Sequence, residues 1–221
     1  MLGATDPGQA SRGSLADEEP MIDVPSQLTE HETELQQLDP LHPAAQAIEY
    51  HTDHWAEHIG AADPDLAFLS QKYPGAITRG DLADLSRTAH AQRDTTTARR
   101  LFLGAMLWGY GTVGYGPYRT ADMLGATNAA DVLRSTLECI RRGAIRQAHE
   151  QFDLPRCGSP FFTKYFYFAG LGCDISVLPL ILDSLVLNEL DQWLRVDVTR
   201  FARFSRNRKG KISIGRDDRK I

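Results

Sequence analysis

The chain has 221 residues, of which 42% are hydrophobic and 24% charged, and its formal net charge is −5. This composition is that of an ordinary soluble protein with one good-sized core, and the apolar runs are too short and too interrupted by charge to span a membrane. Three widely spaced cysteines and a start without a basic-then-apolar stretch argue against a disulfide framework, a cysteine-held metal cluster and a secretory signal, so we expect a cytoplasmic protein.

The two ends of the chain differ in charge. Residues 1–72 carry fourteen Asp or Glu and two basic side chains, whereas residues 194–221 carry ten Lys or Arg and three Asp. The first part, residues 1–38, is too poor in apolar side chains to offset its ordering entropy, so we predict an acidic disordered segment. The basic tail, residues 196–221, indicates a polyanionic partner, unless both ends are merely solvated.

Helical periodicity runs through residues 39–195, which we predict to be one all-α domain. Caps and glycines mark the helix ends in its first half, with Gly60 ending the first helix and a threonine capping the fourth. The predicted helices of this half cover residues 43–60, 64–73, 79–91 and 95–111.

The second half opens with a glycine–aromatic loop, GYGTVGYGPYRTADML, that leads into a short helix. One long amphipathic helix capped by Asn128 follows, with Val132, Leu133, Leu137, Ile140 and Ile145 among its apolar positions. The turn DLPRCGSP then precedes a helix over FFTKYFYFAG, and SVLPLILDSLVLNELDQWL predicts further helix, broken or bent near Pro179. The segment KGKISIG near the end is the one stretch that fits a short strand.

Histidines at helical spacing give the first candidate site. His51, His54 and His58 fall at i, i+3 and i+7, with Asp53 and Glu57 nearby, so a metal on one helix face is one interpretation. A polar helix face is the other, and the sequence offers no fourth ligand. We therefore expect no bound metal.

Glycines interleaved with aromatic residues give the second candidate. The GxG spacings follow a helix and not a strand, so they do not form a dinucleotide-binding motif. Trp108, Tyr110, Tyr115 and Tyr118 could stack on a nucleobase while the glycines bring backbone close to the ligand. The alternative is that these rings pack a tight loop between helices.

Two isolated ionisable residues give the third candidate. Lys164 falls in the predicted first turn of the helix after DLPRCGSP, and Asp183 follows nineteen positions later as the single acid of VLPLILDSLVL. Taken separately, the lysine could extend to the surface and the aspartate could cap a helix. Taken together, they form the kind of pair that buried catalytic sites contain.

This turn, lysine and aspartate resemble the helix–hairpin–helix DNA glycosylases, most closely the 8-oxoguanine DNA glycosylase branch. The phrases WGYGTVGYGPYRT and PFFTKYFYFAG are similar to bacterial 8-oxoguanine-glycosylase-fold proteins associated with CBASS-type antiphage systems. The resemblance covers roughly residues 65–195. Two departures are visible: GSPFFTK lacks the usual G-x-G before the lysine, and no counterpart of the eukaryotic N-terminal β-domain is present.

The resemblance implies a DNA N-glycosylase that can also cleave abasic sites, with Lys164 as Schiff-base nucleophile and Asp183 as essential carboxylate. Burial among phenylalanine and tyrosine rings would lower the pKa of the lysine so that it could act as a neutral amine. No cofactor is implied, and the expected partners are DNA and defence-system proteins. The residues expected to contact DNA or the base are Trp108, Tyr110, Tyr115, Arg119, Gly158, Ser159, Phe161, Phe162, Arg200, Arg203 and Arg206.

Two other functions fit the sequence. In the first, the chain is a catalytically silent nucleic-acid-binding module in which Lys164 only neutralises phosphate. In the second, it is a metal-dependent helical hydrolase that uses the histidines. Trapping of a protein–DNA adduct with borohydride separates the first from a glycosylase, and copurification of a metal would indicate the second.

Overall fold

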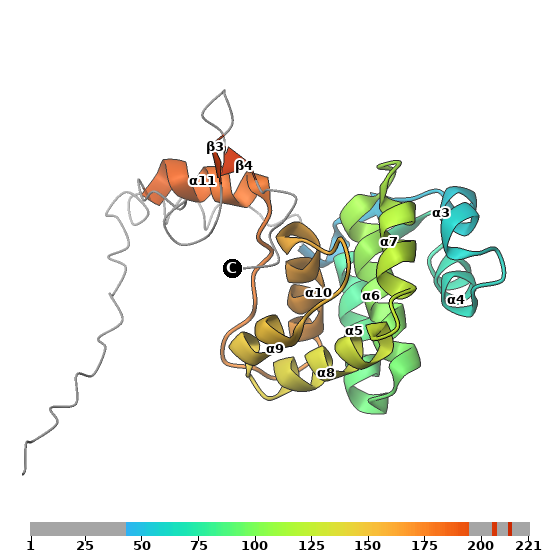
Figure 1. The fold of residues 1–221 in the computed structure, drawn as a ribbon, viewed down its shortest axis with the longest axis horizontal. Coiled ribbons are helices and arrows are strands. Elements are labelled where there is room, and N and C mark those ends of the chain that lie inside the picture. Colours follow the sequence, from blue (N-terminus) through green and yellow to red (C-terminus); the bar gives the residue numbers. More distant parts are fainter. Residues whose placement is uncertain (1–42, 195–204, 207–211, 214–221) are drawn as a thin grey trace, which may run out of the picture.

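The computed structural model describes residues 43–194, 205–206 and 212–213, and Figure 1 shows a helical body with short strands at its margins. The predicted all-α fold is confirmed, since helices form nearly all of the regular structure described. The described helices are α3 (Thr52–Ile59), α4 (Pro64–Lys72), α5 (Arg79–Gln92), α6 (Thr95–Tyr110), α7 (Gly116–Leu124), α8 (Ala129–Arg141), α9 (Ile145–Gln151), α10 (Ser159–Leu171), α11 (Ser184–Leu194) and the 3-10 turn η1 (Pro43–Ala45).

The prediction of a single helix over residues 43–60 is wrong. Strand β1 (Ala47–Glu49) interrupts it and pairs antiparallel with β2 (Ala76–Thr78), with Ile48 opposite Ile77. A β-branched pair fits a strand better than a helix, and Ile77 is fully buried. Only the second half, α3, is helical, and Gly60 ends it in a positive-φ conformation as predicted.

Aspartates take part in the caps of α4, α5 and α6. Asp63 Oδ1 accepts hydrogen bonds from the first amides of α4, and Thr78 and Asp81 form a capping box at α5. At α6 the cap is Asp94, whose Oδ1 accepts from the backbone N–H of Thr97 at 2.7 Å. The prediction that a threonine caps this helix is therefore one residue late, because the carboxylate is the better-placed acceptor.

The long helix predicted after Asn128 is two helices, α8 and α9. Gly143 has φ +71°, a left-handed conformation that stops α8 and lets the chain restart at α9. Asn128 is the N-cap residue of α8, but its side-chain amide donates to the carbonyl of Asp153 instead of capping the helix. The predicted apolar face is confirmed as buried, except that Ile145 is only partly covered.

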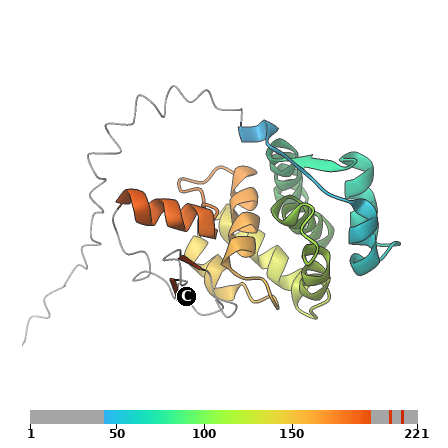
Figure 2. The same cartoon turned by 90° about the horizontal axis from the view of Figure 1, so that it is seen from above.

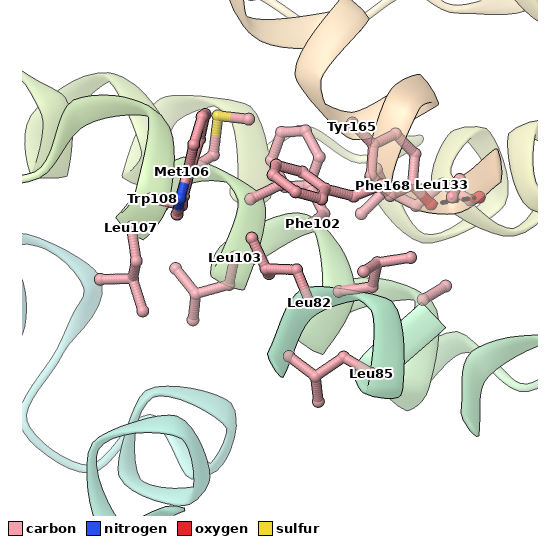
Figure 3. Packing of buried hydrophobic residues seen from close by; sticks show 14 of the residues in the cluster. Leu82, Leu85, Phe102, Leu103, Met106, Leu107, Trp108, Leu133, Tyr165 and Phe168 are labelled. Atoms are coloured by element: carbon pink, nitrogen blue, oxygen red, sulfur yellow. Dashed lines mark hydrogen bonds between the residues drawn. The ribbon is translucent and has the colours of Figure 1, made fainter. Parts of the chain in front are cut away.

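Helix α6 runs through the centre of the body, where α5, α8 and α10 pack around it (Figure 1). Figure 3 shows Phe102, Leu103 and Met106 of α6 among side chains from these neighbours. Tyr165 of α10 is fully buried, packs edge-to-face on Phe102 and donates its hydroxyl to the carbonyl of Leu133 in α8. This packing fixes the face that α10 turns toward α6.

After α10 the chain returns along that helix without regular structure before α11 begins. The prediction of a helix from residue 176 is therefore wrong for residues 176–183, a stretch that contains Pro179. The return is close: a Cβ on Gly170 of α10 would lie 2.7 Å from Leu178 Cδ1. Figure 2 shows α11 at one side of the helical body.

The predicted short strand in KGKISIG is confirmed, because β4 (Ile212–Ser213) pairs antiparallel with β3 (Ser205–Arg206). The acidic segment 1–38 lies outside the described residues, and so does most of the basic tail 196–221, including Arg200 and Arg203. For Arg206 only the backbone position in β3 is described. The predictions for both ends stay predictions.

Candidate active site

The structure brings Lys164 and Asp183 together. The amine Nζ lies 3.6 Å from Asp183 Oδ2 and donates a hydrogen bond of 2.7 Å to the carbonyl of Pro160. Lys164 is 7% exposed, so the interpretation in which it extends to the surface is wrong. The Asp183 side chain is 28% exposed, which leaves this carboxylate accessible from one side of the pair.

Lys164 owes its position to a start of α10 that is earlier than predicted. The helix begins at Ser159, so the lysine falls in its second turn and not its first. There it faces Gly109 of α6, where an added Cβ would lie only 2.9 Å from Lys164 Cδ. The lysine stem therefore fills the space that this glycine leaves free.

Asp183 performs two tasks at once. Its Oδ1 accepts from the backbone N–H groups of Leu185 and Val186, each at 3.1 Å, so its interpretation as the cap of α11 is confirmed. Its Oδ2 is the oxygen near Lys164. The segment before it is held to α10 because Thr163 Oγ1 accepts from the N–H of Leu182 at 3.0 Å.

Burial lowers the pKa of Lys164 below its ordinary value, although the carboxylate of Asp183 partly offsets this. A second cation, Arg79 of α5, also lowers the pKa of the lysine. The guanidinium of Arg79 lies 4.6 Å from the centre of the Trp108 ring and 5.3 Å from that of Tyr167. The buried amine of Lys164 therefore loses its proton more readily than the amine of a free lysine does.

A row of rings leads away from the lysine. Phe161 lies under the amine, with Nζ 5.5 Å from its ring centre, and stacks on Tyr110 at 3.9 Å with an interplanar angle of 17°. Tyr115 packs edge-to-face on Tyr110, and the Arg119 guanidinium lies 4.6 Å from the Tyr115 ring centre. Tyr115 is 51% exposed, so the row runs from the buried amine to the surface.

Two other residues predicted to contact DNA, Trp108 and Phe162, are buried in the core. Trp108 is buried edge-to-face against Phe168, as Figure 3 shows, and its indole N–H points to the carbonyl of Gln46. Phe162 packs in an aromatic cluster with Phe152, on a separate set of rings from the row at Lys164. Both residues therefore act as core residues in the described structure.

Gly158 and Ser159 form the start of α10. The Gly158 carbonyl accepts from the N–H groups of Phe161 and Phe162, which closes the first turn. Ser159 is fully buried, and its hydroxyl has no hydrogen-bond partner among the described residues. The turn before them is fixed to α7, because Arg156 stacks on Tyr118 and donates to its hydroxyl.

Sequence reasoning missed three residues at the site: Arg79, Gly109 and Thr163. The signal for Gly109 is the glycine within WGYG, which we interpreted as backbone close to a ligand and not as room for a lysine. Arg79 and Thr163 gave no signal, since an arginine at a helix start and a threonine in an aromatic helix are both unremarkable in isolation.

The structure brings together two of the three candidate histidines. Potential ligand atoms of His54, Glu57 and His58 all lie within 4.8 Å of one another on α3. His51, which we predicted on the same face, precedes the helix and is not part of this group. Nothing else in the described part of the chain gathers three such side chains.

No helix in the described ranges is long and apolar enough to cross a membrane. A comparison with protein families matches residues 41–209 to the family described as "Putative 8-oxoguanine DNA glycosylase OGG-like protein". No curated protein and no solved structure matches the chain. Because the family match spans well over half of the residues and includes Lys164 and Asp183, the chain belongs to the 8-oxoguanine DNA glycosylase OGG-like family.

Proposed function

We propose that the protein is a DNA N-glycosylase that removes a modified or oxidised base, with Lys164 as its nucleophile. One observation carries this proposal: a buried amine with a lowered pKa lies 3.6 Å from the carboxylate of Asp183. An amine in this setting is the activated nucleophile that covalent catalysis requires. Membership of the OGG-like family supports DNA as the substrate.

In the proposed mechanism, base release uses Lys164, Asp183 and the nucleotide itself. The neutral amine of Lys164 attacks C1′ of a nucleotide turned out of the duplex, and a C–N bond to the lysine forms as the bond to the base breaks. The base leaves with the bonding electron pair and takes up the proton that the lysine nitrogen loses once it is bonded to C1′. Asp183 stabilises the positive charge that develops on the sugar.

Strand cleavage can follow from the same intermediate. Once the sugar ring opens, the lysine is joined to C1′ as an imine, which acidifies the proton at C2′. When that proton passes to solvent, a C2′–C3′ double bond forms and the C3′–O bond breaks, so that the phosphate leaves with the bonding electron pair by β-elimination. Water then releases the lysine, so that this proposal includes abasic-site lyase activity.

The surroundings of the pair suit a flipped nucleotide. Tyr115 offers an exposed ring at the outer end of the row that starts at Phe161, and a base can stack on such a surface. We assign a phosphate contact to Arg119, which lies against the Tyr115 ring. We include the basic tail with Arg200, Arg203 and Arg206 in the proposal as further phosphate contacts.

The setting of this activity is also part of the proposal. The resemblance to proteins of CBASS-type systems supports a role in antiphage defence, with defence proteins as partners, and DNA repair is the other setting that we propose. Such a role places the protein in the cytoplasm, where both host and invading DNA are accessible.

Borohydride trapping on a panel of duplexes that carry oxidised bases or an abasic site tests the proposal. The wild type is expected to form a covalent adduct, and Lys164→Gln is expected to lose it while still binding DNA. Lys72→Gln, which removes an exposed lysine of α4, is the matched control and retains the adduct. Asp183→Asn keeps an oxygen for the cap yet slows base release by orders of magnitude.

Each alternative has its own outcome. A protein that binds these duplexes but yields no adduct with any of them is a silent binding module. Adduct formation that survives in Lys164→Gln would contradict the assignment of the nucleophile. Activity that simply follows the folded fraction of each variant would leave the pair with a structural role only.

A further inference from the structure

We infer that His54, Glu57 and His58 of α3 form a binding site for a divalent transition metal such as Zn²⁺. The three residues fall in the order His-x-x-Glu-His, which places both histidines four positions apart on one helix face. Imidazole nitrogen and carboxylate oxygen are ligands that zinc takes readily. The inference does not depend on the proposed glycosylase activity.

The geometry of His54 carries the inference. Its Nε2 lies 3.1 Å from the carbonyl oxygen of Gly114, and a carbonyl only accepts, so Nε2 bears the proton. Its Nδ1 then faces Glu57 Oε2 at 3.4 Å. In this tautomer the Nδ1 lone pair and the carboxylate oxygen of Glu57 face the same space, which is how two ligands of one metal ion are arranged.

The distances suit a metal. A tetrahedral zinc with bonds of about 2.0–2.2 Å holds its ligand atoms roughly 3.3–3.6 Å apart. The contact of 3.4 Å between His54 Nδ1 and Glu57 Oε2 matches one edge of that tetrahedron. The ligand atom of His58 lies within 4.8 Å of both, which a change of side-chain rotamer closes on an exposed helix face.

The hydrogen bond from His54 Nε2 to the Gly114 carbonyl is of the kind that metal-bound histidines make. Histidine ligands ordinarily donate their second ring N–H to a carbonyl or carboxylate, which fixes the orientation of the ring. Gly114 belongs to the glycine–aromatic loop, next to Tyr115. A metal on α3 would therefore hold this loop in place through His54. Three protein ligands leave the fourth position to solvent.

A direct contact between His54 and Glu57 with no metal is the competing explanation. The two explanations differ in the part played by His58. A direct contact between His54 and Glu57 needs no third ligand, whereas a metal loses a ligand when His58 is removed. The experiment therefore centres on His58→Gln.

The full chain, free of any histidine tag and stripped of metal, is titrated with Zn²⁺ in competition with a chromophoric chelator. The wild type is expected to bind Zn²⁺ more tightly than His58→Gln and Glu57→Gln by at least about tenfold. His51→Gln removes a neighbouring exposed histidine that lies outside the group and is expected to match the wild type. Circular dichroism checks that each variant is folded.

Two further readouts make the outcome decisive. Zn²⁺ is expected to raise the thermal midpoint of the wild type and of His51→Gln but not of His58→Gln. Co²⁺ in place of Zn²⁺ is expected to give the visible absorption of a four-coordinate site only where all three ligands are present. Equal Zn²⁺ affinity in the wild type, His58→Gln and Glu57→Gln would overturn the inference, as would a wild type that binds no Zn²⁺.

Discussion

Replacement of Gly109 by alanine tests how strictly the position of Lys164 matters. The new methyl carbon would lie 2.9 Å from Lys164 Cδ, whereas ordinary carbon–carbon contacts are about 3.5–4.0 Å. The lysine stem must therefore move by roughly 0.6–1.1 Å to relieve the overlap. A displacement of about 1 Å at a reacting group can lower the rate by about 100-fold.

The effect of this change on folding is expected to be small. Overpacking lowers the free energy of unfolding by about 1–3 kcal/mol. Alanine in place of glycine inside a helix raises it by about 0.5–1 kcal/mol. Gly109 lies within α6, so the two terms act in opposite directions. A fall in rate of about 100-fold in a protein that remains folded at 25 °C is then a local effect on the amine.

The assay is the single-turnover rate of adduct formation with an abasic-site duplex, measured beside urea unfolding. Gly114→Ala is the matched control, because a Cβ at that position meets nothing within 4 Å. We expect the control to retain the wild-type rate. An unchanged rate in Gly109→Ala would refute the claim that this glycine sets the position of the lysine.

Three further predictions concern charge. Arg79→Leu removes a cation that lowers the pKa of Lys164, so the pH at which adduct formation reaches half its maximum should rise, while Arg79→Lys should show a smaller change. Asp63 is desolvated, but its pKa is lowered on balance by hydrogen bonds from Arg99 and from backbone amides. Its stabilising effect is therefore present above the unfolded-state pKa and lost as pH falls through the folded-state pKa. Asp63→Asn keeps the cap of α4 and should cost roughly 1–2 kcal/mol at pH 7 in urea unfolding, with a smaller difference from wild type at pH 3. Deletion of residues 196–221 should lower the slope of log affinity against log salt by about 0.9 for each phosphate that the tail neutralises, and an unchanged slope would exclude the tail from DNA binding.

The sequence predicts the elements whose signals are local. Gly60 and the apolar spacing of α8 were enough to place helices because capping and amphipathicity depend on neighbours a few positions away. Strand β1 could not be found in this way. Its partner β2 lies some thirty residues further on, and the periodicity of residues 43–60 alone favours a helix.

At the candidate site, too, local signals were visible in the sequence and contacts between distant residues were not. The spacing of Lys164 and Asp183 was visible in the sequence because each is isolated among apolar residues. Their surroundings were not visible, since Gly109 approaches the lysine only through the packing of α6 on α10, and Arg79 arrives from α5. Tertiary contacts of this kind leave no periodic pattern in the chain.

Asp183 caps α11 and lies beside Lys164 at the same time. A carboxylate has two oxygens, and the cap of α11 uses Oδ1, which leaves Oδ2 for Lys164. The backbone amides of α11 therefore hold the carboxylate in position whether or not the amine is charged. Since a neutral amine attracts a carboxylate only weakly, a site that depends on a deprotonated Lys164 needs such an anchor. The cap supplies it, so its hydrogen bonds stabilise α11 and orient the candidate catalytic pair at the same time.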